Sequence, residues 1–313
     1  MKRVLLRVKV AISWRWRGLL LRYFGKLARI GPRFHIHARW PWPIRKPWRR
    51  KRLRLYPIEG GLGDELMCSP ILAEIKRRNP ACEITFCSRF PSLFESNPHI
   101  DHLEKFRSGE NDHGHGMIYR NAKPPPRPLM AMMAECVGLI LEHEVFTQPD
   151  LHEVSPDLKQ ALAAIPEPQI VIQPKPGKWT PNKEWPADHW RELVGDLLDD
   201  YNVIEVGDES IFKDLESPRF YSFAGKTDLQ EFAYIISKAT IFLGPPSSGM
   251  HFARIFNVPS SIVFGGYESP AGYRYEFKNA FYNPTHCAPC WLTTPCPFDH
   301  KCLRGIEPAP VID

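Results

Sequence analysis

The chain has 313 residues, a net charge of +6 and 43% apolar residues, which is enough for two domains with hydrophobic cores. No apolar stretch approaches the roughly 18 residues that span a membrane, and no N-terminal run reaches the about 7–15 residues of a signal peptide. These properties argue against a membrane-spanning or secreted protein. We therefore expect a cytoplasmic protein whose eight cysteines are thiols or metal ligands.

The basic charge is concentrated at the N-terminus. Residues 1–54 contain 18 Lys and Arg and no Asp or Glu, whereas the rest of the chain has 23 basic and 35 acidic residues. Five of the nine tryptophans also lie in this basic segment. We expect residues 1–50 to form a basic, aromatic arm attached to a mildly acidic globular body.

The arm has a helical pattern. Apolar residues recur every three or four positions from Leu5 to Ile30, which predicts one apolar stripe on a helix that ends near Gly31 and Pro32. The Pro-rich residues 35–51 predict an irregular linker.

Three interpretations of the arm are open. Tryptophan with flanking Lys and Arg suits adsorption to the anionic inner face of the inner membrane, where the protein would be peripheral. Alternatively, the stripe packs on the body of the protein. Basic charge with aromatics can also bind nucleic acid, but the body shows no nucleic-acid module, so we expect no such partner.

The elements of the body fall into two sets. The first set lies in an expected domain of residues 51–165. In chain order it comprises strand Leu53–Ile58, a helix to about Arg78, strand Ile84–Cys87, short helix Pro91–Asn97, extended segment Ile100–Phe106, short strand Met117–Tyr119 and helix Leu129–Glu142. A proline-punctuated connection, residues 148–168, follows.

The second set lies in an expected domain of residues 166–313. It comprises strand Ile170–Gln173, helix Asp188–Leu198, strand Val203–Val206, helix Asp228–Lys238, strand Thr240–Leu243, helix Met250–Phe256 and strand Ser261–Phe264. Strands that alternate with helices predict parallel sheets with helices on both faces. We expect an α/β protein of two Rossmann-like domains with a cleft between them, in which ligands bind at the carboxyl ends of the strands.

A glycine-rich turn, "IEGGLGDEL", follows the first strand. Gly61 and Gly63 fit the start of a dinucleotide-binding fingerprint, but Leu66 stands where the third glycine belongs, and Asp64 would repel a pyrophosphate. No acidic residue ends the second strand to hold a ribose. We expect instead that the glycines leave room for an acceptor and that Asp64 takes a proton from its attacking hydroxyl. Asp64 could also cap the helix, and the two roles are compatible.

Four segments, in order over about residues 53–306, resemble glycosyltransferase family 9, the heptosyltransferase-like family. They are "GLGDELMCSPILAEIKRRNPACEITFC" with "NPHID", then "KEWPADHWRELVGDL", then "FAGKTDLQEFAYIISKATIFLGPPSSGMHFARIFNVPSSIVFGG", and finally "CAPCWLTTPCPFDHKC". The resemblance implies a GT-B fold, with an acceptor-binding N-terminal domain and a C-terminal domain for a nucleotide-activated sugar. Family members typically transfer heptose from ADP-heptose to a lipopolysaccharide core sugar, with inversion and without a metal requirement. The family's catalytic base matches Asp64.

The resemblance also implies donor-binding residues. Lys183 matches the lysine that contacts phosphate, since a diphosphate leaving group needs positive charge. Thr180 could add a hydroxyl. Glu209 lies where a ribose hydroxyl could be met, and its alternative is solvent exposure.

The start of the helix after strand Thr240–Leu243 supplies a further set. Ser247, Ser248 and Gly249 open this helix, whose free N–H groups would face the diphosphate. Many family members have an Asp just before the Ser/Thr-Gly pair, where this chain has Pro245 and Pro246. We expect His251 to fix the start of the helix rather than to take part in chemistry.

Four cysteines close together near the C-terminus are candidate metal ligands: Cys287, Cys290, Cys296 and Cys302. Four thiolates would suit a structural Zn or Fe ion. The second pair is spaced more widely than in a usual zinc knuckle, so reduced thiols or a local disulfide are the alternative.

Three functions follow. The first is transfer of a sugar, heptose from ADP-heptose, onto a lipid-linked lipopolysaccharide core saccharide. The second is a protein O-heptosyltransferase with a cysteine-bound metal. The third is a non-catalytic sugar-nucleotide-binding protein, if the departure at Pro245 and Pro246 breaks the donor site.

Overall fold

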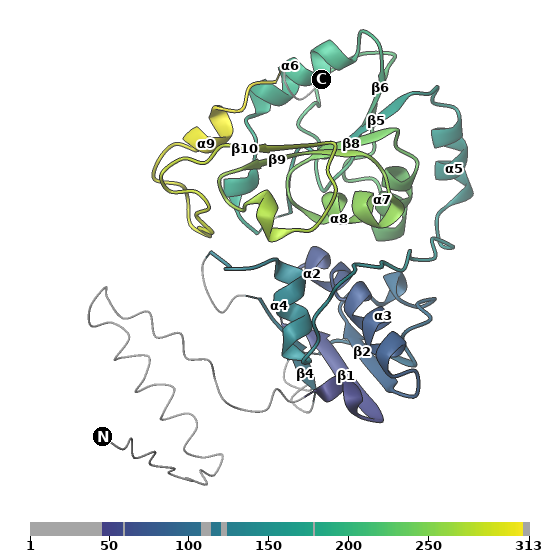
Figure 1. Ribbon diagram of the computed structural model, residues 1–313. Coiled ribbons are helices and arrows are strands. Elements are labelled where there is room, and N and C mark those ends of the chain that lie inside the picture. The colour runs from purple at the N-terminus through teal and green to yellow at the C-terminus, as the bar shows by residue number, and fades with distance from the viewer. Residues whose placement is uncertain (1–45, 59, 108–113, 120–123, 178, 309–313) are drawn as a thin grey trace, which may run out of the picture. The chain divides into compact units, whose positions relative to one another are not determined.

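The computed structural model describes residues 46–58, 60–107, 114–119, 124–177 and 179–308 (Figure 1). By its internal contacts the chain divides into Met1–Pro43 and Ile44–Asp313. The helix expected between Leu5 and Ile30 lies outside the described residues. Among the helices that are described, none is long and apolar enough to cross a membrane.

The first sheet has four parallel strands in the order β3-β2-β1-β4. The strands are β1 (Arg52–Pro57), β2 (Glu83–Ser88), β3 (His102–Lys105) and β4 (His115–Met117). Helices α2 (Leu62–Leu66), α3 (Ser69–Arg78) and α4 (Leu129–Cys136) pack beside it, and η2 (Pro91–Leu93) is a short 3-10 turn. Leu53 and Leu55 of β1 are buried while Arg54 and Tyr56 between them are partly exposed, as the alternation of a strand requires.

The helix predicted to reach Arg78 is in fact two helices. α2 ends at Leu66, and α3 begins at Ser69 with Pro70 in its first turn. Proline has no backbone N–H to donate, so it is favoured at a helix start and ends the preceding helix.

The second sheet has six parallel strands in the order β10-β9-β8-β5-β6-β7. They are β5 (Gln169–Ile172), β6 (Asn202–Glu205), β7 (Phe220–Ser222), β8 (Ile241–Gly244), β9 (Ser260–Gly265) and β10 (Asn279–Tyr282). The helices of this half are α6 (Ala187–Leu197), α7 (Leu229–Ser237), α8 (Ser248–Phe256) and α9 (Lys301–Arg304), with 3-10 turns η3 (Pro181–Lys183) and η4 (Pro270–Gly272).

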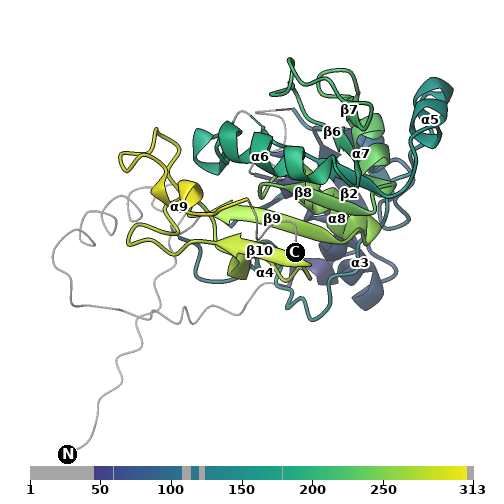
Figure 2. The ribbon, with the colours of Figure 1, turned by 90° about the horizontal axis from the view of Figure 1, so that it is seen from above.

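Both faces of this sheet are covered. Ile170 and Ile172 belong to a core shared with Trp190 of α6 and Leu303 of α9, and α6 lies across this face in Figure 2. Val171 between them faces the opposite core, which α7 and α8 supply. The structure therefore confirms the predicted α/β architecture with two parallel sheets.

Several elements were not predicted. β7, β10 and α9 are short and irregular in pattern. Helix α5 (Pro156–Ala163) lies in the stretch predicted as a proline-punctuated connection. Its start is nevertheless encoded locally, because Ser155 accepts a hydrogen bond from Leu158 N at 3.3 Å and Pro156 occupies the first helical position.

The end of the expected linker packs on the body. Residues Pro47–Arg49 form the 3-10 turn η1, and Trp48 contacts the core of the first half. The Asn79 side chain donates hydrogen bonds to the carbonyls of Trp48 and Arg50 at 2.9 and 3.1 Å. Residues 46–50 therefore belong with the body rather than with the arm, whereas the boundary expected near residue 165 remains a prediction.

Candidate active site

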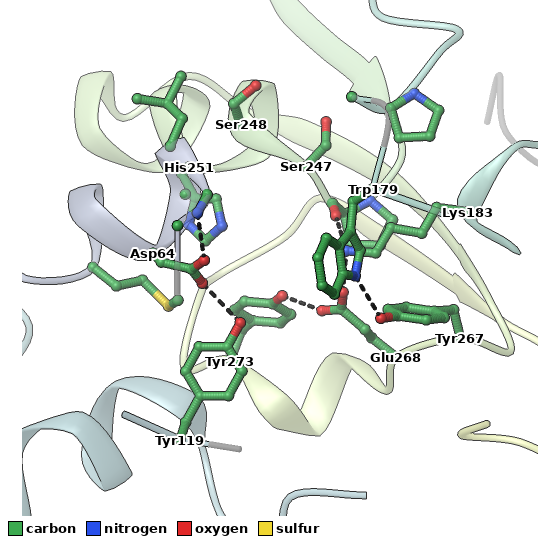
Figure 3. A pocket seen from close by; sticks show the side chains of 18 of the residues that line it. Asp64, Tyr119, Trp179, Lys183, Ser247, Ser248, His251, Tyr267, Glu268 and Tyr273 are labelled. Atoms are coloured by element: carbon green, nitrogen blue, oxygen red, sulfur yellow. Dashed lines mark hydrogen bonds and ion pairs between the residues drawn. The ribbon is translucent and has the colours of Figure 1, made fainter. Parts of the chain in front are cut away.

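A cavity of about 780 Å³ lies where the two halves meet. Helix α2, which follows β1, and the loop after β4 bring Asp64 and Tyr119 to it. The segments after β5, β8 and β9 bring Lys183, Ser247 and Glu268. Figure 3 shows Asp64 on one side of this space and Lys183 on the other. The carboxyl ends of the parallel strands thus build the cavity, as expected for this class of sheet.

Asp64 is buried, with 8% of its surface exposed. One carboxylate oxygen accepts a hydrogen bond from Gly61 N at 3.0 Å, and the other accepts from the Tyr119 hydroxyl at 2.7 Å. The N-cap of α2 is Gly61, and Asp64 is the third helical residue, which bonds back to the cap. Asp64 therefore caps the helix from its third position, through the bond to Gly61 N, and is not the N-cap that was considered. Both contacts fix its carboxylate at the cavity wall.

Position 63 has to be a glycine because the imidazole of His251 packs directly against it. A Cβ at position 63 would lie 2.5 Å from Cδ2 and 2.6 Å from Nε2 of the imidazole. Gly61 and Gly63 both line the cavity, but at Gly63 the space that the missing side chain leaves is filled by His251. The packing thus indicates that Gly63 makes room for His251, whereas we expected it to make room for an acceptor.

His251 joins the two halves. It lies on α8, is 4% exposed, and its Nδ1 hydrogen-bonds the Tyr275 hydroxyl at 2.8 Å. Burial, with a smaller contribution from the charge of Lys183, lowers the pKa of His251 to about 3. A neutral imidazole at neutral pH suits these contacts. The side chain bonds Tyr275 and packs on Gly63, so the expected role of His251 in fixing the helix start remains a prediction.

This pKa predicts a pH dependence of stability. The unfolded His251 takes up a proton near pH 6.5, and the folded one does so only near pH 3. Its contribution is therefore complete above pH 6.5 and is lost as pH falls toward 3. Between pH 7.5 and pH 5 we expect His251 to account for about 2 kcal/mol of lost unfolding free energy.

Denaturant unfolding at both pH values checks this expectation. Replacing His251 with Asn, which keeps a partner for Tyr275, should remove that part of the pH dependence, although the variant is less stable at both. The same change at the exposed His152 serves as the control. An unchanged pH dependence in the His251 variant would show that the imidazole titrates normally.

Lys183 is held by two acceptors from the same half. Its ammonium donates to the Pro246 carbonyl at 2.9 Å and forms an ion pair with Glu268. The Tyr273 hydroxyl donates to the other oxygen of Glu268 (Figure 3). Burial, and then the charge of Glu268, raise the pKa of Tyr273 well above its usual value, so the phenol remains a donor. The carbonyl of Pro246 thus contacts Lys183 in the segment where many family members have an Asp.

The start of α8 is partly occupied by a side chain. Gln173 Oε1 accepts hydrogen bonds from the Ser247 hydroxyl at 2.9 Å and from Gly249 N at 3.3 Å. Gly249 does not line the cavity, whereas Ser247 and Ser248 do. Of the three residues predicted to open a phosphate site, the two serines are the ones placed at the cavity.

Two predicted donor contacts lie elsewhere. Thr180 is buried, and its hydroxyl donates to the Leu292 carbonyl at 3.1 Å and caps η3. Glu209 is exposed and pairs with Lys175. Neither residue lines the main cavity or the smaller one beside it, because each side chain is directed to a structural partner in its own half.

A smaller cavity of about 220 Å³ adjoins the first. The two share Leu62, Gly177 and Ser248 in their walls. Asp208 and Asp228, after β6 and before α7, line the smaller cavity with polar groups.

The cysteine segment contributes to the main cavity through Trp291, which lies between Cys290 and Leu292 and is 8% exposed. All four cysteines are thiols, and burial raises the pKa of Cys290 and Cys302. Among the described residues, no three His, Cys, Asp or Glu side chains are arranged to hold a metal ion. The predicted Zn or Fe site remains a prediction.

Sequence reasoning missed Tyr119, Glu268, Tyr273 and Trp291. Tyr119 and Glu268 each follow the carboxyl end of a strand, β4 and β9. That position is a usable signal, since ligands bind there in parallel sheets. Tyr273 and Trp291 lie in irregular segments with no comparable signal.

The two α/β halves with parallel sheets match the GT-B fold of solved heptosyltransferase structures. Residues 130–274 match the model of glycosyltransferase family 9 (heptosyltransferase), which confirms the family that the sequence motifs predicted. Residues 130–274 are thus similar to a heptosyltransferase-type glycosyltransferase domain. Asp64 lies before the matched residues, so its role stays a prediction.

Solved structures support the fold. The iron-containing dodecameric glycosyltransferase TibC from enterotoxigenic E. coli H10407 is 18% identical, with a TM-score of 0.65 over 83% of this chain and 74% of that one. E. coli ADP-heptose LPS heptosyltransferase II is 17% identical, with a TM-score of 0.59 over 83% of this chain and 96% of that one. A family 9 glycosyltransferase from Veillonella parvula DSM 2008 is 15% identical, with a TM-score of 0.61 over 83% and 95%. Among curated proteins, none matches the chain.

Proposed function

We propose that the protein transfers heptose from ADP-heptose to a lipopolysaccharide core saccharide, with inversion at the anomeric carbon. The observation that carries this proposal is the placement of Asp64 and Lys183 in the walls of one cavity. A carboxylate that can accept a proton and an ammonium that can face a diphosphate are the two groups that such a transfer needs. The names of the solved structures that share this fold supply the donor and acceptor classes.

In the proposed reaction, Asp64 accepts the proton of the acceptor hydroxyl as its oxygen attacks the anomeric carbon. The bond from that carbon to the β-phosphate oxygen breaks, and ADP leaves. Tyr119 and Gly61 N orient the carboxylate through the bonds described above. Lys183 and the Ser247–Ser248 turn at the start of α8 would stabilise the negative charge that develops on the diphosphate.

The smaller cavity is our candidate for the adenosine. It adjoins the main cavity at Ser248, so a nucleoside there would place its diphosphate at the start of α8. Asp208 or Asp228 would then accept hydrogen bonds from ribose hydroxyls, in place of the predicted Glu209.

Calorimetric titration of the full-length protein with ADP-heptose, GDP-mannose and UDP-glucose tests the donor. Transfer to a delipidated lipopolysaccharide core oligosaccharide, followed by mass spectrometry, tests the reaction. We expect binding of ADP-heptose alone and a mass increase of one heptose. Binding without transfer to that oligosaccharide or to a protein substrate would favour the non-catalytic alternative, and preference for another nucleotide sugar would overturn the donor assignment.

We also propose that residues 1–45 hold the protein at the anionic inner face of the inner membrane, where a lipid-linked acceptor is located. The support is the apolar stripe with flanking basic residues. Each Lys or Arg near such a surface contributes roughly 1 kcal/mol of attraction.

Deleting residues 1–45 tests this proposal. The cut is placed before Lys46 because Trp48 packs on the core and Asn79 binds the backbone there. We expect a folded, ADP-binding protein that no longer sediments with vesicles containing phosphatidylglycerol, and full-length protein that is released as salt rises. Truncated protein that unfolds or aggregates would instead indicate that the stripe packs on the body.

A further inference from the structure

We infer that Glu268 accepts hydrogen bonds from the hydroxyl groups of the donor sugar and so determines which sugar is transferred. This inference rests on the proposed function and deepens it. Glu268 follows β9, is 3% exposed and lines the main cavity. Nothing in the sequence motifs assigned it a role.

Glu268 lies next to the space that the donor sugar would occupy in the proposed reaction. Figure 3 shows Glu268 and Tyr273 between Asp64 on one side and Lys183 on the other. The contacts agree, because Glu268 pairs with Lys183 at one oxygen and accepts from Tyr273 at the other, and the Tyr273 ring lies 5.8 Å from that of His251. A sugar whose anomeric carbon is near Asp64 and whose diphosphate is near Lys183 would pass over this carboxylate.

The chemistry of the group fits a hydroxyl partner and not a phosphate. Each carboxylate oxygen can accept more than one hydrogen bond, so acceptor capacity remains after the bonds from Lys183 and Tyr273. A charged acceptor binds hydroxyl donors strongly when water is excluded. The same negative charge repels a diphosphate held by its neighbour Lys183. A buried carboxylate here therefore favours binding of the sugar and opposes binding of the bare nucleotide.

The proposal therefore predicts that one substitution at Glu268 weakens the binding of ADP-heptose without weakening the binding of ADP. In Glu268→Gln, the amide oxygen can still accept from Lys183 and the shape is preserved. Calorimetry should show ADP-heptose bound roughly ten- to hundredfold more weakly, because charge-assisted hydrogen bonds to the sugar are lost. ADP should bind unchanged or up to about tenfold more tightly, because a repulsive charge is removed. The control is Asp214→Asn, which removes an exposed ion pair with Arg191 in the same half.

A second variant covers a failure of Glu268→Gln to fold. Glu268→Asp keeps the charge but withdraws the oxygens from the sugar, so ADP affinity should stay unchanged while ADP-heptose affinity falls. Wild-type protein that binds neither ligand overturns the proposed function and, with it, this assignment. Wild-type protein that binds both ligands, with variants that change both affinities by the same factor, overturns the assignment of Glu268 alone.

Discussion

Asp64→Asn should lower the rate of heptose transfer by about 10²–10⁴-fold, because the amide cannot take the proton of the acceptor hydroxyl. We expect ADP affinity to be unchanged, since Asp64 is on the opposite side of the cavity from Lys183 (Figure 3). Single-turnover transfer and ADP titration on the same protein measure the two effects.

The structure explains why this variant should fold. Asp64 accepts one hydrogen bond from Gly61 N and one from Tyr119. An asparagine can keep both, with its oxygen accepting from Gly61 N and its amide donating to the tyrosine hydroxyl, which can act as donor or acceptor. Transfer near the wild-type rate by a folded Asp64→Asn protein would remove Asp64 from the mechanism.

Replacing Lys183 should give the second largest effect. We expect Lys183→Ala to weaken ADP-heptose binding and to slow transfer by about 10²–10³-fold, because the leaving diphosphate loses its countercharge. The same change leaves Glu268 buried without its cation, which by itself destabilises the fold.

A double variant separates the two consequences. Lys183→Met with Glu268→Gln removes both charges, so thermal stability should recover relative to Lys183→Ala while transfer stays slower than in Glu268→Gln alone. Recovery of transfer together with stability would mean that Lys183 supports the fold and that the phosphate site lies elsewhere. Equal ADP affinity in wild type and Lys183→Ala would lead to the same conclusion.

The pattern of the sequence was sufficient for the architecture. Alternating strands and helices predicted two parallel sheets, because burial on both faces produces short apolar runs such as residues 170–172 between amphipathic helices. The Gly-Asp turn predicted Asp64, and the resemblance of the Lys-x-Trp-Pro segment to glycosyltransferase family 9 implied Lys183; both residues line the cavity. These motifs are short and continuous in the chain, so they can be recognised without coordinates.

Only the tertiary structure decided the partners of these residues. Tyr119 is 55 positions from Asp64 along the chain, and Glu268 reaches Lys183 from a different strand end. Gly63 is needed because His251 of the other half packs against it. The periodic pattern of apolar residues does not predict such contacts. They depend on the order of the strands in each sheet, which decides which strand ends are neighbours. The sequence thus determined which groups are available for chemistry, and the packing of the two halves decided which of them meet.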